Sequence, residues 1–161
     1  MFVAKRLERS PKMLIVSFFF YFVCAGLAIT GSAKLLSSFA DVPLLDQTEA
    51  VTGMSYRWLF RVAASLEFLT LYGVVRLRSP LPKALMTMAL FNTFFVYRIV
   101  RIVFGLQPTG CPCFGFLTDW TGIDRHTVDL LLGVYLFTVE IGCVAVLFLF
   151  ASREASADGT A

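Results

Sequence analysis

Cys111 and Cys113 stand one residue apart in a Gly-Cys-Pro-Cys-Phe-Gly segment, and they are the residues best suited to chemistry. Cysteines this close can bring their Cα atoms within the range of about 4.4–6.8 Å that a disulfide requires. Pro112 restricts the backbone between the sulfurs, while Gly110 and Gly115 permit tight turns on either side. A small ring of this kind is strained, and strained, exposed disulfides tend to be catalytic or regulatory. The segment therefore predicts a dithiol that exchanges electrons with an external partner.

Two other roles of the same cysteines stay open from their spacing. The pair could be a structural clip of the loop, or two reduced thiols without a redox role. Two thiolates could also bind copper(I) or zinc. Zinc takes about four ligands, and the nearby ligand types are the single histidine, His126, and the carboxylates of Asp119 and Asp124. We therefore assign no metal site.

The rest of the chain has the composition of a membrane protein. Hydrophobic residues make up 58% of the 161 residues and charged residues 16%, whereas soluble domains carry roughly 25% charged residues. Apolar runs of about 20 residues, at a rise of about 1.5 Å each, cross a hydrocarbon core about 30 Å thick. Open strands would leave backbone groups unsatisfied in lipid. The sequence predicts an all-α, polytopic four-helix bundle with spans at 13–36, 56–75, 84–105 and 126–150.

Three regions are expected along the chain: a basic N-terminus (1–12), the transmembrane domain (13–150) and a disordered tail (151–161). The first apolar run follows basic residues, as in a signal peptide, but it is longer than the 7–15 residues of a signal core. We interpret it as a retained helix.

Orientation is predicted from the lysines and arginines near the ends of the spans. With four spans both termini lie on one side, and most of the basic residues in loops fall there, which predicts cytoplasmic termini. The loops 37–55 and 106–125 then face outward, toward the periplasm of a bacterium, where disulfides persist. The expected location is the bacterial inner membrane. The basic residues on the cytoplasmic side are Lys5, Arg6, Arg9, Lys12, Arg76, Arg78, Lys83 and Arg153.

Ionisable residues within the spans are costly in lipid and indicate a site with partners. Lys34, Arg98 and Arg101 fall in the outward halves of their spans and Glu67 falls near the middle of its span, and the depths of Glu67 and Arg98 are compatible with an ion pair. We predict that these four residues line a polar pocket under the cysteine turn. The alternative is that they form structural ion pairs between helices. Glu140 has no cation at a matching depth.

Cys24 and Cys143 fall near the middle of the first and fourth spans. A buried free cysteine usually acts as a small hydrophobic residue, and we favour that role. The alternative is a second, internal dithiol that relays electrons, as in the four-helix vitamin K epoxide reductase family. This comparison rests on analogy of fold alone.

Three features together resemble the MauE-type branch of the DoxX-like membrane proteins. They are the Gly31-Ser-Ala-Lys34 segment, Glu67 in the second span, and the Cys-x-Cys-Phe-Gly turn before the fourth. The resemblance implies a four-helix membrane protein associated with methylamine utilisation. Such a protein would support maturation of the disulfide-rich small subunit of methylamine dehydrogenase. The family usually has a small residue between the cysteines, where this chain has Pro112.

We therefore expect an inner-membrane accessory protein for thiol–disulfide chemistry. Its partner would be a periplasmic thioredoxin-like or disulfide-rich protein, and a quinone is a candidate electron acceptor. A formal charge of +3, without a basic run interleaved with aromatics, argues against nucleic acid. The alternatives are a non-catalytic anchor or assembly subunit, which would not need the cysteines, and a small-molecule carrier that uses the buried charges. The sequence leaves the partner, the acceptor and the oligomeric state open.

Overall fold

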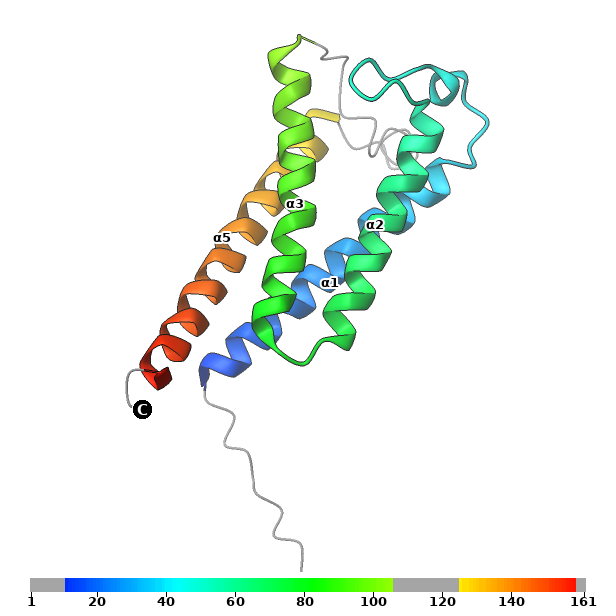
Figure 1. Cartoon of the computed structure of the whole chain (residues 1–161). Helices are drawn as coiled ribbons and strands as arrows, with labels where there is room; N and C mark the ends of the chain where they lie inside the picture. The colour runs from blue at the N-terminus through cyan, green and yellow to red at the C-terminus, as the bar shows by residue number, and fades with distance from the viewer. Residues whose placement is uncertain (1–10, 106–124, 159–161) are drawn as a thin grey trace, which may run out of the picture.

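The computed structural model describes residues 11–105 and 125–158, which form a bundle of long helices (Figure 1). The helices of this part of the chain are α1 (Pro11–Ser37), α2 (Tyr56–Arg76), α3 (Pro80–Val103) and α5 (Arg125–Asp158), with a short 3-10 helix, η1 (Pro43–Asp46). Each of the four long helices contains a segment long and apolar enough to cross a membrane. Together with the absence of strands from the described residues, this confirms the predicted all-α, four-helix membrane fold.

Two helix boundaries differ from those expected by more than two residues. Helix α3 begins at Pro80 rather than at Ala84, because Pro80 and Pro82 fit the first turn, where a helix needs no backbone N–H. Helix α5 continues to Asp158, where a disordered tail was expected from residue 151 onward. The residues at 151–158 include alanine, arginine and glutamate, which favour helix, and neither proline nor glycine occurs before Gly159.

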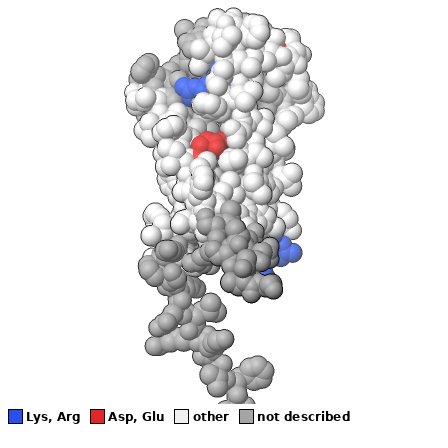
Figure 2. Space-filling model, turned by 60° about the vertical axis from the view of Figure 1, so that its left-hand side comes forward, with Lys and Arg blue, Asp and Glu red and all other residues white. Residues whose placement is uncertain are grey.

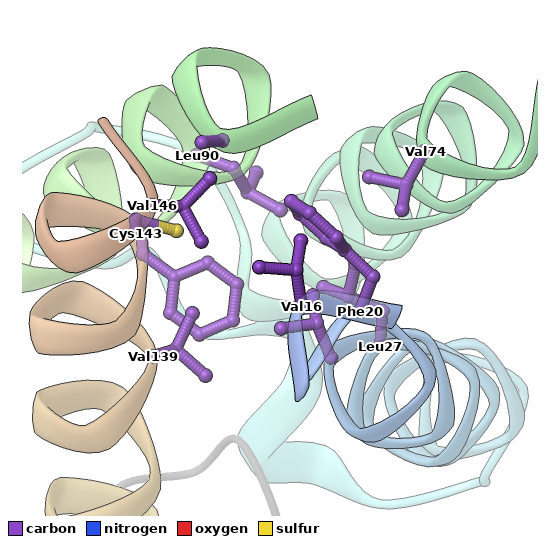
Figure 3. Packing of buried hydrophobic residues seen from close by; sticks show 11 residues of the cluster. Val16, Phe20, Leu27, Val74, Leu90, Val139, Cys143 and Val146 are labelled. Carbon is purple, nitrogen blue, oxygen red and sulfur yellow. The ribbon is translucent and has the colours of Figure 1, made fainter. Parts of the chain in front are cut away.

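The helices pack as two antiparallel pairs. Helix α1 lies along α2, and α3 lies along α5 (Figure 1). Buried apolar side chains from all four helices meet in one core, where the sulfur of Cys143 lies among Val139, Val146 and Leu90 (Figure 3). The core consists of Val16, Phe20, Val23, Leu27, Val74, Ala84, Leu90, Phe91, Val139, Cys143 and Val146.

Two glycines set the close approach of α1 and α5. A Cβ atom at Gly26 would collide with the ring and hydroxyl of Tyr135, and one at Gly142 would collide with the ring of Phe19. The Tyr135 hydroxyl donates a hydrogen bond of 3.2 Å to the carbonyl of Val23. Large side chains on each helix thus fill the gaps left by glycine on the other, as is common between helices in lipid.

These contacts also fix the relative positions of Cys24 and Cys143. Since Gly26 faces Tyr135 and Phe19 faces Gly142, the two cysteines are staggered by six residues, or about 9 Å along the helix axis. A disulfide requires Cα atoms within about 7 Å, and both thiols are free. Cys143 is part of the core and Cys24 packs against it, in agreement with a hydrophobic role.

Replacing Gly26 with leucine should destabilise the bundle. Tyr135 cannot turn away easily, because its ring packs against Phe22 and Phe91 with centroids 5.4 and 5.7 Å away. We expect Gly26→Leu to lower the free energy of unfolding by about 1–3 kcal/mol, measured by thermal unfolding in detergent micelles. Ala25→Leu is the matched control, since Ala25 is exposed. Equal stability of the two variants would contradict the packing described above.

Candidate functional site

A buried ion pair joins the first two helices. The Lys34 ammonium contacts the Glu67 carboxylate at Oε1. Only 7% of the surface of Lys34 and 2% of the surface of Glu67 is exposed. The ring of Phe94 from α3 covers the pair, with its centroid 4.7 Å from Lys34 Nζ. A Cβ atom at Gly31 would lie 3.2 Å from Glu67 Oε2, so glycine lets α1 approach the carboxylate. The Gly31-x-x-Lys34 segment and Glu67 therefore belong to one site.

The second oxygen of Glu67 has a different environment. Oε2 is buried and accepts no hydrogen bond within the described part of the chain. The hydroxyl of Thr30, on the neighbouring turn of α1, donates to the carbonyl of Gly26 at 2.9 Å and lies near the Glu67 carboxylate. Buried carboxylate oxygens normally have a donor. Glu67 Oε2 is thus the atom of this site where a proton or a water molecule could be bound.

The loop between α1 and α2 contributes a second buried carboxylate, Glu49, which is 1% exposed. Its Oε2 accepts hydrogen bonds from the backbone N–H groups of Val51 (3.0 Å) and Thr52 (2.8 Å) and from the Thr52 hydroxyl (3.0 Å). Its Oε1 lies 3.9 Å from Nε of Arg101 on α3. Gly53 closes the turn with a φ of 68°, which favours glycine. Glu49 therefore shapes the loop and ties it to α3.

Sequence reasoning did not identify Glu49 as a site residue. Its signal was indirect: Arg101 is a cation in a span that needs an acidic partner, and the outward loop holds few carboxylates. The choice among them depends on the fold of the loop, which no helical periodicity reports.

An exposed pair anchors the same loop to α2. Arg57 Nε donates to Asp46 Oδ1 at 2.9 Å, and Arg57 Nη1 donates to the carbonyls of Ser38 (3.0 Å) and Ala40 (3.3 Å). The hydrogen bond from Arg57 lowers the pKa of Asp46 below its ordinary value of 3.8. The loop thus packs beside the beginning of α2, beyond the end of α1.

The four residues of the predicted pocket, Lys34, Glu67, Arg98 and Arg101, contact different partners in the structure. Lys34 and Glu67 form their own pair under Phe94, and Arg101 is held beside Glu49. The guanidinium of Arg98 lies toward α5, 3.7 Å from the place of a Cβ atom on Gly133. The ion-pair partner of Glu67 is Lys34, not the depth-matched Arg98 that the sequence suggested.

The predicted catalytic pair, Cys111 and Cys113, lies outside the described residues. Among the side chains that the structure describes, no group of three histidine, cysteine or acidic residues could hold a metal ion. Comparison of the chain with protein-family models, with curated proteins and with solved structures gives no match. The resemblance to the MauE and DoxX-like proteins therefore stays a prediction from the residues.

Replacing one residue of the buried ion pair should destabilise the protein more than replacing both. We expect Lys34→Met or Glu67→Met alone to lower the free energy of unfolding by about 3–5 kcal/mol, since each leaves one buried group unpaired. The double variant should regain most of that loss, because two methionines of similar volume replace both charges. Thermal unfolding in micelles measures all three, with the exposed Asp46→Asn as a mild control. A double variant less stable than either single variant would contradict the pairing.

The pKa of Asp46 should depend on Arg57. A carboxyl whose pKa is lowered by folding contributes stability at neutral pH, and loses it only as the pH falls through the folded pKa, here below 3.8. Arg57→Gln should move the pKa of Asp46 back toward 3.8, as followed by NMR of its carboxyl carbon. Arg78→Gln, at the other end of α2, should leave it unchanged. An unmoved pKa in Arg57→Gln would exclude this contact.

Proposed function

We propose that this chain is a MauE- or DoxX-like protein of the bacterial inner membrane that supports thiol–disulfide exchange through Cys111 and Cys113. The proposal rests on the place where the cysteine segment is connected to the helices. The segment that holds both cysteines joins the end of α3 to the beginning of α5, at the end of the bundle where the buried charges gather. We refer to this end, where α1 and α3 finish and α2 and α5 begin, as the loop end.

Chain length limits how far the cysteines can be from these charges. Cys111 follows Gly105 by six residues, which span at most about 20 Å. Arg101 stands in the last turn of α3, and its Nε lies 3.9 Å from Glu49 Oε1. A cation near a thiol lowers the pKa of the thiol and raises its thiolate fraction. In the proposal, Arg101 has this role, while Lys34 and Glu67 hold the helices beneath it.

The proposed exchange conserves atoms and electrons. The thiolate of one cysteine attacks a disulfide of the partner, so a mixed disulfide forms and one partner thiolate leaves. The thiolate of the second cysteine then attacks the mixed bond, which gives a Cys111–Cys113 disulfide and a partner reduced by two electrons. In reverse, the same steps oxidise the partner, and a quinone could take up the two electrons and two protons.

The proposal includes an orientation. Both termini would be cytoplasmic, and the loop end would face the periplasm, where a thioredoxin-like or disulfide-rich partner acquires its bonds. The basic residues near the spans support this orientation. The methylamine pathway is the specific context that the family resemblance suggests.

Single cysteine variants should trap the partner. If one cysteine is replaced, the mixed disulfide cannot be resolved and accumulates. We expect Cys113→Ser or Cys111→Ser, expressed in cells, to give a reductant-sensitive adduct with a periplasmic protein on non-reducing gels. The double variant should give none.

Cys24→Ser and Cys143→Ser are the matched controls, because both thiols are free and lie in or beside the core. They should leave any adduct of the wild type unchanged. The proposal fails if neither loop variant forms an adduct, and if membrane-impermeant maleimide labels the loop from the cytoplasmic side alone.

A further inference from the structure

Glu140 is a carboxylate within the membrane to which the described part of the chain donates no hydrogen bond at Oε1. Glu140 lies at the middle of the α5 span, Leu130–Phe150, ten residues from each end, or about 15 Å from either boundary. Of the acidic residues in the four spans, Glu67 is buried, whereas Glu140 is partly exposed. Figure 2 shows an acidic patch at mid-height on this side of the molecule, surrounded by uncharged residues and with basic side chains above it.

Among the described residues, no ion pair joins Glu140 to a lysine or arginine. Glu140 Oε1 is buried without a hydrogen-bond donor among the described residues. Arg98 meets α5 at Gly133, seven residues away, or about 10 Å along the axis. The contrast with Glu67 is informative, because that carboxylate receives a lysine from the adjacent helix.

The surface around Glu140 is apolar and faces outward. Phe137 and Val144, three residues before and four residues after Glu140 on the same side of α5, are 67% and 42% exposed, and the adjacent Ile141 is 54% exposed. Thr138 and Ala145 are also exposed on this helix, but at two and five residues from Glu140 they lie on a different side of it. A carboxylate on such a surface is costly unless a cation or donor meets it from outside the bundle.

We propose that the face of α5 centred on Glu140 docks a transmembrane helix of another protein that presents a lysine or arginine at the middle of the membrane. Charge complementarity favours this occupant over a second copy of the chain. A second copy in the same orientation would bring its own Glu140 to this depth, and its lysines and arginines lie toward the ends of the spans. The interaction is independent of the thiol chemistry proposed above.

The test uses a synthetic helix of known sequence. The protein, labelled with a fluorescent donor, is reconstituted in phosphatidylcholine liposomes with acceptor-labelled peptides of about 21 leucines. One peptide carries a single central lysine and the other carries none. We expect energy transfer to give about tenfold stronger association of the lysine peptide. Glu140→Gln should abolish this preference, whereas the neighbouring control Thr138→Ala should keep it.

Three results would overturn the inference. The first is that the wild-type protein, for which no folding control is needed, binds both peptides equally. The second is that the preference for the lysine peptide persists in Glu140→Gln. The third is that step counting of single-molecule photobleaching finds a dimer that depends on Glu140 and that the lysine peptide does not disperse, in which case a second copy covers this face. Replacing both Cys111 and Cys113 with serine should leave the peptide preference intact, which separates this test from that of the thiol proposal.

Discussion

The structure depends most on the contact between Lys34 and Glu67. In lipid no water compensates a buried charge, so each of these groups is tolerated because the other is present. The contact requires α1 and α2 to meet in one register, with Gly31 against the carboxylate and Phe94 of α3 over the ammonium. One ion pair thereby specifies how three helices are placed, while the apolar core below it supplies most of the buried surface.

The loop between α1 and α2 extends this specification to the end of α3. Glu49 uses one oxygen to form its own turn and directs the other toward Arg101, so a single side chain both folds the loop and attaches it. Arg57 performs the complementary task from α2, where it binds Asp46 and two backbone carbonyls. The loop end is therefore polar and tied together, and it is the part of the bundle from which the cysteine segment departs.

Much of the helical architecture could be predicted from the sequence, because apolar runs of this length have few alternatives in a membrane. The pairing of charges could not be predicted in the same way. Counting depth from each helix end assumes that neighbouring helices begin at one level. Here Glu67 faces the last turn of α1, so the beginning of α2 extends beyond α1 and packs against the loop. Because of this offset, Glu67 pairs with Lys34 and not with Arg98. The contact of Glu49 with Arg101 depends on the same offset.

The two helix pairs are close together at one end of the bundle and apart at the other. At the first end, α2 and α3 are joined by three residues, Leu77 to Ser79. At the loop end, the two helix pairs stand apart (Figure 1). The short turn thus connects the α1–α2 pair to the α3–α5 pair at one end of the bundle and acts as the pivot between them. Any change in the angle between the α1–α2 and α3–α5 arms has its smallest amplitude at the pivot and its largest at the open end. The contact of Glu49 with Arg101, 3.9 Å long, joins the two helix pairs at the end farthest from the short turn, so its loss would remove a restraint that the turn cannot replace.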